Sequence, residues 1–338
     1  MGLGDTAVSS HGAPKLSPRG QPVSLEGLPR VDVGMVTFNT RELTIAALHR
    51  LVDANDGCRL RLLVRDNASS DGTAEAVAAR FPEAEVDAGS ENLGFAAGVN
   101  TLLARSDAPW FLALNSDAWP EPGAVHRLVR AAEAFPCAAA VAPRLERPDG
   151  TLEHSTYPFP SLEVAAMTGA GLYHRVGRRR AQELLLMESW MHDRPRPVDW
   201  AVGAALLLRR AALEDIGGFD EQFFMYVEDL EWAWRARQRG WEIRFEPSAV
   251  VRHVGNASGA AAYGRRRTAT YLNNTYRFYG RHHGPVSTTA FRVLNLVGCA
   301  RLYAQFRLRR DRAQAAFWAD HVRAHLRLGP ASDRPSPS

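Results

Sequence analysis

Apolar runs of strand length alternate with stretches of helical periodicity along the N-terminal part of the chain. The first unit is a β-rich run at 31–38 followed by apolar side chains at helical spacing over 41–52, with Thr40 as a candidate N-cap. The same pattern recurs at 60–64 with 73–80, and at 110–114 with 123–135. Strands that alternate with helices predict an α/β fold with a central, mostly parallel sheet flanked by helices.

Polar side chains follow three of these predicted strands. Asn39, Asp66 and Asp117 each follow an apolar strand. The carboxyl ends of parallel strands form one rim of a sheet, and ligands bind there. Asp and Asn are also common turn residues, so any one of them alone is better explained by structure. Three together indicate a ligand site.

The rest of the chain predicts a further organisation. We expect a flexible Gly/Ser/Pro-rich leader at 1–29, a catalytic domain at 30–260, a helical C-terminal extension at 261–328 and a disordered tail at 329–338. The segment 157–197 is irregular and rich in proline, which suggests a mobile lid over an acceptor site.

Composition narrows the class of protein. Of 338 residues, 46% are hydrophobic and 23% are charged, which excludes collagen-like, coiled-coil and wholly disordered chains. Cys58, Cys137 and Cys299 form no CxxC pair, which favours a reducing cytoplasm. No run of about 18 uncharged apolar residues predicts a membrane span. The basic residues are all arginine except Lys15, so arginine clusters alone are weak indicators of phosphate binding.

Seven short motifs, taken together and in order, resemble family 2 glycosyltransferases, most closely the rhamnosyltransferase-like branch. They lie at 36–39 (VTFN), 66–73 (DNASSDGT), 91–100 (ENLGFAAGVN), 114–117 (LNSD), 217–221 (GGFDE), 224–229 (FMYVED) and 251–255 (VRHVG). The resemblance implies a GT-A-like nucleotide-diphospho-sugar transferase fold. It also implies a divalent cation, Mg²⁺ or Mn²⁺, and sugar transfer with inversion at the anomeric carbon.

The resemblance assigns a donor site to the first four motifs. A carboxylate can accept the imide N–H of uracil or thymine, and Asp66 is the matched residue. Small residues and amides of the third motif would let the backbone approach the ribose and diphosphate, although a turn into a helix explains the glycines nearly as well. The expected donor-binding residues are Thr37, Asn39, Asp66, Asn92, Gly94, Gly98, Asn100, Asn115 and Asp117.

The same resemblance implies two metal ligands. Asp117 is the first, although Asn115 stands where many members carry the first carboxylate of an Asp-x-Asp triplet. The rhamnosyltransferase-like branch often has Asn at that position. His253, after the predicted strand 246–251, matches the second ligand and offers an imidazole nitrogen. A histidine at a strand end is otherwise more often a packed or hydrogen-bonded residue.

Asp229 matches the family's general base, which removes the proton of the acceptor hydroxyl. The alternative is that Glu228 and Asp229 only form an acidic first turn, which the helix dipole favours. Residues expected on the acceptor side are Trp200, Gly203, Phe224, Tyr226 and Glu228. Core packing explains the run 200–208 equally well.

The predicted C-terminal helices carry an apolar stripe, Phe291, Leu294 and Val297, flanked by Arg292 and Arg301. Such a basic amphipathic segment could rest on an anionic membrane, which would put a cytoplasmic protein at the inner face of the plasma membrane. An ordinary helix that closes the catalytic domain is the alternative.

These patterns favour a metal-dependent inverting glycosyltransferase of polysaccharide or cell-wall biosynthesis. The branch resemblance favours dTDP-rhamnose over other dTDP- or UDP-sugars, with a glycan, a lipid-linked saccharide or a natural product as acceptor. One alternative is a non-catalytic nucleotide- or carbohydrate-binding protein on the same fold. An arginine-rich nucleic-acid-binding protein is disfavoured because no basic stripe with stacking aromatics coincides with the motifs. A nicotinamide oxidoreductase lacks its GxGxxG after the first strand.

Overall fold

The structure is a computed structural model, and it describes residues 27–55, 57–169, 171, 192–255 and 267–327. Most of the predicted leader and all of the predicted tail lie outside these residues, as does much of the predicted acceptor lid.

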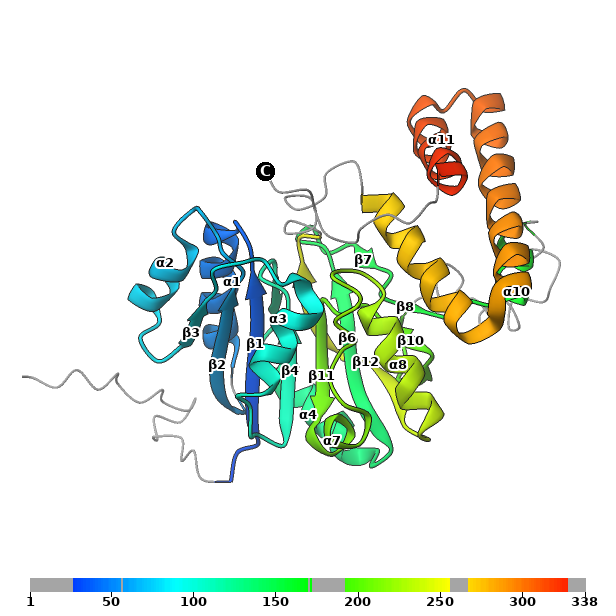
Figure 1. Ribbon diagram of the computed structural model, residues 1–338. Coiled ribbons are helices and arrows are strands. Elements are labelled where there is room, and N and C mark those ends of the chain that lie inside the picture. The colour runs from blue at the N-terminus through cyan, green and yellow to red at the C-terminus, as the bar shows by residue number, and fades with distance from the viewer. Residues whose placement is uncertain (1–26, 56, 170, 172–191, 256–266, 328–338) are drawn as a thin grey trace, which may run out of the picture.

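One mixed sheet forms the centre of the molecule (Figure 1), with strand order β3-β2-β1-β4-β11-β6-β12-β5. The strands β3, β2, β1 and β4 are parallel, β11 runs antiparallel to β4 and β6, and β6 is parallel to β12. Their bounds are β1 Arg30–Thr37, β2 Arg59–Asp66, β3 Glu85–Ala88, β4 Trp110–Leu114, β5 Ala118–Pro120, β6 Ala138–Glu146, β11 Ala205–Arg209 and β12 Glu242–His253. The predicted α/β class with a mostly parallel sheet is confirmed.

Helices cover both faces of this sheet and enclose two apolar clusters. One face is covered by α1 (Arg41–Ala54), α2 (Thr73–Arg80) and α4 (Ala124–Ala134), and the other by α3 (Gly94–Leu103), α7 (Arg210–Ile216) and α8 (Glu228–Gln238). Strand β4 is buried along its whole length because it supplies side chains to both clusters. A strand buried on both faces needs a continuous apolar run, as Trp110–Leu114 provides.

The predicted strand and helix positions are confirmed, and Thr40 occupies the predicted N-cap position of α1. The Thr40 side chain makes no cap hydrogen bond to α1. Its hydroxyl instead joins a buried cluster with the hydroxyls of Thr37 (2.9 Å), Thr44 (3.2 Å) and Ser116 (3.1 Å). Tertiary partners outcompete the local cap, and the cluster ties the end of β1 to the segment after β4.

Short strands border the rim of the sheet. A hairpin pairs β7 (Leu152–Glu153) with β6, β9 (Arg196–Val198) pairs with β12, and β8 (Thr156–Tyr157) pairs with β10 (Trp200–Ala201). These segments carry several of the polar residues described below.

The predicted helical extension is confirmed beyond the sheet. Helix α10 (Arg267–Leu308) is kinked at Gly284, where φ is 76°, and Pro285 follows. Helix α11 (Arg312–Arg327) packs back on α10, and α5 (Leu162–Gly169) packs on α10 from the side of the sheet. No helix among the described residues is both long and apolar enough to cross a membrane.

Candidate active site

Asp66, the last residue of β2, is fixed by the turn that follows it. The side chain is buried, its Oδ1 accepts a hydrogen bond from the Ser69 hydroxyl, and its Oδ2 accepts the Ser69 N–H at 3.2 Å. Burial raises the pKa of Asp66, and the bonds from Ser69 oppose that rise. These bonds hold the carboxylate at the rim, where it can accept a hydrogen bond from a ligand.

Asn39 connects the loop after β1 to this same turn. Its backbone is left-handed, with φ 52°, a conformation that Asn tolerates better than most residues. The side-chain Oδ1 accepts the Ser70 N–H at 2.8 Å, and the Asn39 N–H donates to the Ser69 hydroxyl at 2.8 Å. Asn39 thus braces the turn that holds Asp66.

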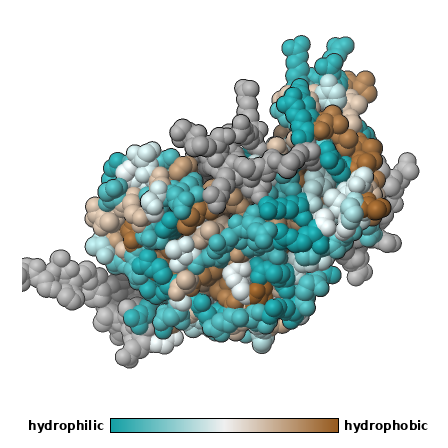
Figure 2. All heavy atoms as spheres, in the orientation of Figure 1, coloured by the Kyte–Doolittle hydropathy of each residue, from teal (hydrophilic) through white to brown (hydrophobic). Residues whose placement is uncertain are grey.

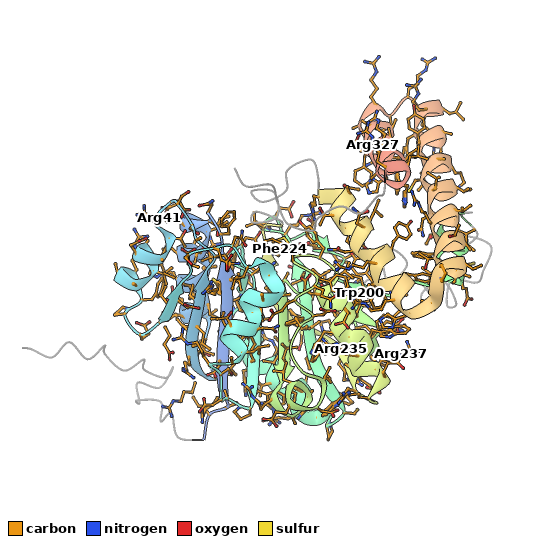
Figure 3. The ribbon with its side chains drawn as sticks, in the orientation of Figure 1. Arg41, Trp200, Phe224, Arg235, Arg237 and Arg327 are labelled. Atoms are coloured by element: carbon orange, nitrogen blue, oxygen red, sulfur yellow. The ribbon has the colours of Figure 1, made fainter. Side chains whose placement is uncertain are left out.

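The turn at Asp71 is also local in origin. Asp71 Oδ1 accepts the Thr73 N–H at 3.1 Å, and Gly72 takes φ 74°. Asp71 Oδ2 accepts the Arg41 N–H at 3.0 Å, which joins the first turns of α1 and α2. Figure 3 shows Arg41 and Phe224 near the upper end of the sheet region, below the α10–α11 hairpin.

The third motif shapes the entry into α3. Asn92 Oδ1 accepts the Gly94 N–H at 2.9 Å, and Gly94 has φ 84°. A Cβ on Gly94 would lie 2.2 Å from the Phe224 carbonyl oxygen, so only glycine fits there. Gly98 packs on the Val36 side chain, which a Cβ would meet at 3.0 Å. Both glycines serve close packing in this structure.

Asn100 lies further along α3 and contacts a different part of the chain. Its amide donates to the Phe219 carbonyl at 2.8 Å and to Glu221 Oε1 at 2.9 Å, and its Oδ1 accepts the Phe219 N–H at 2.9 Å. A Cβ on Gly218 would lie 2.4 Å from Asn100 Oδ1. The side chain therefore fixes the Gly217–Gly218 turn, and we leave Asn100 and Gly98 out of the proposed donor contacts.

Asp117 and His253 face each other across the rim. His253 ends β12 and pairs in register with Ala118 of β5, directly after Asp117. His253 Nε2 lies 3.4 Å from Asp117 Oδ1, and His253 Nδ1 lies 3.1 Å from Glu153 Oε2. Burial alone would lower the pKa of His253, but the two flanking carboxylates outweigh it and raise the pKa to about 9.

This pair fits a divalent cation. His253 Nε2 is buried without a well-formed hydrogen bond, and its ring is held from the other side by Glu153, as in carboxylate–histidine–metal arrangements. No group of three or more His, Cys, Asp or Glu that could hold a metal occurs among the described residues. Mg²⁺ and Mn²⁺ commonly take few protein ligands and fill the remaining positions with substrate phosphates and water.

Asp229 lies in the first turn of α8 and is almost completely buried. Its Oδ2 accepts the Gly203 N–H at 3.0 Å, and its Oδ1 accepts the Leu230 N–H at 2.8 Å. Burial raises the pKa of Asp229 to about 6, against the effect of these hydrogen bonds. A buried carboxylate with a pKa near neutrality has the properties of a general base.

Glu228 precedes Asp229 and is also buried. Its Oε2 atom has no hydrogen-bond partner among the described residues. Burial, and then the charge of Asp229, raise the pKa of Glu228 well above its ordinary value. Neither carboxyl forms an ion pair within the part of the chain that the structure describes, and two adjacent buried carboxyls of this kind are costly for the fold, which is typical of functional sites.

The remaining residues expected on the acceptor side lie on β10 and in the loop before α8. Trp200 is buried, stacks on Tyr157 with ring centroids 4.9 Å apart, and donates its indole N–H to the Pro158 carbonyl at 3.1 Å. Burial raises the pKa of Tyr157, and the nearby carboxylates of Glu153 and Asp229 act in the same direction. Tyr226 is half-buried, with the Arg267 guanidinium 5.8 Å from its ring centre.

Hydrogen bonds connect the Asp66 turn to the segment before Asp229. Asn67 Nδ2 donates to the Gly94 carbonyl at 2.9 Å, and the Phe95 N–H donates to the Phe224 carbonyl at 2.8 Å. Phe224 lies above the central strands at the upper edge in Figure 3. The β2 end and the loop before α8 are therefore neighbours.

A second set of hydrogen bonds connects Asp229 to the Asp117 segment. The Asn115 N–H donates to the Ala204 carbonyl at 2.9 Å, next to Gly203, whose N–H donates to Asp229. Three distant stretches thus deliver Asp66, Asp117 and Asp229 to one rim.

Two contacts of this rim were not predicted from the sequence. Glu153 is held beside His253 by a β-hairpin whose Pro148-Asp149-Gly150 turn is a recognisable signal. Asn274 of α10 donates to backbone carbonyls of the loop before Asp229. A lone Asn in a helical stretch carries no signal for such a contact.

The chain belongs to glycosyl transferase family 2, whose family model matches residues 32–217. It is 31% identical over 237 residues to the N-acetylglucosaminyl-diphospho-decaprenol L-rhamnosyltransferase of Mycobacterium tuberculosis, a match that covers 66% of this chain and 75% of that protein. This relative supports the rhamnosyltransferase-like branch. The protein is thus a rhamnosyltransferase-like glycosyltransferase.

Solved structures show the same fold at low sequence identity. The mannosyltransferase PcManGT from Pyrobaculum calidifontis, in complex with GDP-Man and Mn²⁺, superposes with a TM-score of 0.55 at 19% identity and covers 93% of this chain. GalNAc-T7 with UDP, GalNAc and Mn²⁺ gives a TM-score of 0.51 at 12% identity, covering 79% of this chain and 54% of its own. The GT-A-like fold class is confirmed.

Proposed function

We propose that this protein transfers rhamnose from dTDP-rhamnose to a hydroxyl of a lipid-linked saccharide, in a metal-dependent reaction that inverts the anomeric carbon. The observation that carries the proposal is the buried, hydrogen-bonded Asp229, whose pKa is raised to about 6, on the same rim as Asp66 and Asp117. The mycobacterial relative, an N-acetylglucosaminyl-diphospho-decaprenol L-rhamnosyltransferase, supports both the rhamnosyl donor and the lipid-linked acceptor.

The donor site follows from the rim. Asp66 accepts the imide N–H of the base, held by Ser69 and, through that turn, by Asn39. Asp117 and His253 would hold the cation, which neutralises the negative charge of the leaving diphosphate. Glu153 keeps the His253 ring in place through Nδ1.

The transfer itself is a single displacement. Asp229 removes the proton of the acceptor hydroxyl while that oxygen attacks the anomeric carbon, and the bond to the diphosphate breaks on the opposite side of the carbon. The Gly203 and Leu230 N–H groups hold the carboxylate in one orientation. A direct attack from the opposite side inverts the configuration.

The experiment that tests this proposal uses purified protein and a panel of nucleotide sugars with Mg²⁺ or Mn²⁺. We expect thermal stabilisation and transfer to be strongest with dTDP-rhamnose, and NMR of the product to show the inverted anomer. Asp117→Ala or excess EDTA should suppress transfer far more than it lowers the melting temperature. Full transfer in EDTA, or preference for an unrelated nucleotide, would contradict the proposal.

We also propose that the α10–α11 hairpin contacts an anionic membrane at the cytoplasmic face. Residues 267–327 contain eleven arginines and two aspartates, a formal charge of +9 in a chain whose total is +4. Figure 2 shows apolar atoms among hydrophilic ones over this hairpin. Its exposed large apolar side chains include Val286, Val293, Val297, Leu308, Phe317 and Leu326. Phe291 of the predicted stripe is instead buried against Tyr279, with ring centroids 4.2 Å apart.

Sedimentation with lipid vesicles tests the membrane contact. We expect binding to vesicles that contain phosphatidylglycerol, weaker binding to pure phosphatidylcholine, and loss of binding at high salt. Val293→Glu with Val297→Glu should reduce binding, while Val254→Glu, an exposed valine outside the hairpin, should not. Equal binding to both vesicle types would contradict charge recognition.

A further inference from the structure

One face of α10 contacts the loop that leads to Asp229. Asn274, Arg277 and Arg281 are spaced at i, i+3 and i+7 and so lie on one side of the helix. Arg281 binds Asp220 Oδ2 at 2.7 Å, and Arg277 donates to the Gln222 carbonyl at 3.0 Å. This face of α10 therefore lies beside the loop from Asp220 onward.

Asn274 contacts the end of that loop. Its Nδ2 donates to the Met225 carbonyl at 3.0 Å and to the Tyr226 carbonyl at 3.3 Å. The residue has no exposed surface, and its Oδ1 has no hydrogen-bond partner among the described residues. Burial of an amide oxygen without a hydrogen bond costs free energy of folding, and Asn has a low helix propensity. Packing and helix stability therefore do not explain an Asn at this position.

The backbone that Asn274 holds is strained. Tyr226 and Val227 have φ values of 69° and 80°, in the left-handed region that a β-branched residue such as Val227 rarely enters. Such residues are energetically costly and persist only where the surroundings hold them. Glu228 and Asp229 follow directly, so this left-handed turn sets where α8 begins and where the Asp229 carboxylate points.

The loop is held from both sides. The Phe95 N–H of α3 binds the Phe224 carbonyl at 2.8 Å, while Asn274 of α10 binds the next two carbonyls. The α3 side belongs to the motif region, but α10 begins 50 residues after residue 217, where the family match ends. The catalytic loop therefore depends on the C-terminal extension.

We propose that Asn274 is a positioning residue of the transfer reaction, which locks the left-handed turn at Tyr226–Val227 and so orients Asp229 toward the acceptor hydroxyl. The inference rests on the proposed role of Asp229 as base. A displacement of about 1 Å in a catalytic group can lower the rate on the order of 100-fold.

Asn274→Leu and Asn274→Asp test this inference in the full chain. Leucine fills the space without donating, and aspartate keeps the shape but loses the donor. We expect kcat to fall roughly 10- to 100-fold in both. The Kd for dTDP should stay within about twofold of the parent value, since no donor contact is removed. Asn295→Leu is the matched control because its amide donates to the Phe291 carbonyl at 2.8 Å and bonds the Tyr276 side chain, both on the same helix.

A second variant and a second readout keep the inference falsifiable. Arg281→Gln, at a partly exposed position, removes the bond to Asp220 and should lower kcat by only a few-fold. Hydrogen exchange of the amides at 222–227 should accelerate in Asn274→Leu but not in Asn295→Leu. If Asn274→Leu does not fold, a lowered kcat with unchanged dTDP affinity in Arg281→Gln supports the inference, and an unchanged kcat overturns it.

The outcomes separate this inference from the proposed function. If Asp229→Asn is inactive and Asn274→Leu transfers at the rate of Asn295→Leu, the positioning role is wrong and the base stands. A parallel loss of kcat and dTDP affinity in Asn274→Leu would indicate general loosening and would also overturn the inference. If Asp229→Asn retains the parent rate, the proposed base itself is wrong.

Discussion

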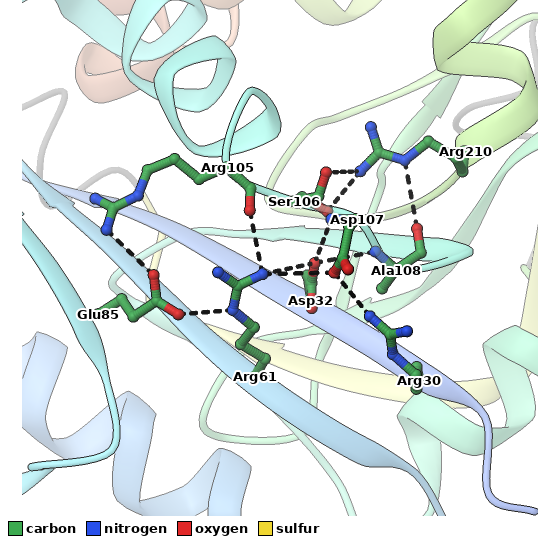
Figure 4. A network of polar contacts seen from close by, with 9 residues as sticks. All are labelled: Arg30, Asp32, Arg61, Glu85, Arg105, Ser106, Asp107, Ala108 and Arg210. Carbon is green, nitrogen blue, oxygen red and sulfur yellow. Dashed lines mark hydrogen bonds and ion pairs between the residues drawn. The ribbon is translucent and has the colours of Figure 1, made fainter.

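Carboxylate side chains lie in opposite surroundings at the two ends of the central sheet. At the amino end of β1 and β2, arginines and carboxylates form one network (Figure 4). Arg61 binds Glu85 at 2.7 Å and lies 3.6 Å from Asp107, Arg105 binds Glu85 at 3.1 Å, and Arg30 binds Asp107 at 2.7 Å. A hydrogen bond from Arg61 lowers the pKa of Glu85. Opposite charges at this end stabilise each other's ionised form.

At the carboxyl end, Asp117 faces His253, but Asp66, Glu228 and Asp229 are buried without such a partner among the described residues. No ion pair among the described residues includes Asp66, Glu228 or Asp229, and burial raises the pKa of each of them. The comparison teaches that one end is arranged for stability and the other for chemistry, because a base that is already paired with arginine would hold its proton too weakly. Variants of matched chemistry at the two ends should therefore affect different quantities.

Asp229→Asn should give the largest effect of all. Removal of a general base lowers the rate on the order of 10²–10⁴-fold, and we expect kcat to fall about 10³-fold. Stability above pH 6 should stay equal or rise, because the variant removes a buried charge that the fold disfavours. Steady-state kinetics and urea denaturation of the same preparation measure both. A kcat loss that merely follows a lowered stability would argue against a catalytic role.

Glu153→Ala should weaken the metal site without removing a ligand. The His253 ring would lose the partner of its Nδ1 atom, and loss of such a partner lowers metal affinity roughly 10- to 100-fold. Titration of Mn²⁺ into the protein with dTDP, followed by electron paramagnetic resonance, measures the Kd directly. Asp149→Ala in the same hairpin is the control, since among the described residues the Asp149 side chain accepts its hydrogen bonds from Thr151 of the turn. An equal loss in both variants would point to the hairpin fold instead.

The pH dependence of transfer should report the Asp229 carboxyl. Its pKa is raised to about 6 by burial, and only the ionised form can accept a proton. The value of kcat/KM should therefore rise about tenfold per pH unit below pH 6 and level off above it. Glu228→Gln should leave the inflection near pH 6, since burial is the main cause of the shift. A flat profile between pH 5 and 7 would refute the assignment.

The sequence predicts the rim better than its supports. Asp66 and Asp117 follow apolar strands, and that periodicity is local, so their position at the rim is readable from the chain. Asn100 is different, because its amide is hydrogen-bonded to the backbone of Phe219, 119 residues away. No local sequence pattern reveals that contact. Asn274 likewise depends on how α10 packs on the loop. Thr40 shows the same competition, since tertiary hydroxyl partners replace the local cap.

Asp32→Asn should destabilise the fold without touching the reaction. Asp32 is buried at the amino end of the sheet, where its Oδ2 accepts the Asp107 and Ala108 N–H groups at 3.1 and 3.2 Å. The amide oxygen of Asn can still accept from these donors, but the variant loses the charge that strengthens both hydrogen bonds and attracts Arg61, 3.7 Å away, at a cost of about 1–3 kcal/mol of the free energy of unfolding. Urea denaturation checks this. The kcat should stay at the parent value, and a large fall in kcat would break the separation of the two ends.

Arg30→Gln should give the smallest effect, although it removes a 2.7 Å ion pair with Asp107 from the same network. Both side chains are largely exposed, at 49% and 72%, so water and salt screen their attraction. Formation of the ion pair also restricts two long side chains, and this loss of entropy opposes the attraction. We expect the midpoint of urea denaturation to shift by an amount close to the error of the measurement. In 1 M NaCl we expect no shift, because at about that salt concentration charge–charge attraction is screened beyond roughly 3 Å. The contrast with Asp32→Asn then measures how far burial, and not the number of ion pairs, determines what a charged side chain contributes to the free energy of unfolding. A shift as large as that of Asp32→Asn would mean that the network acts as one unit.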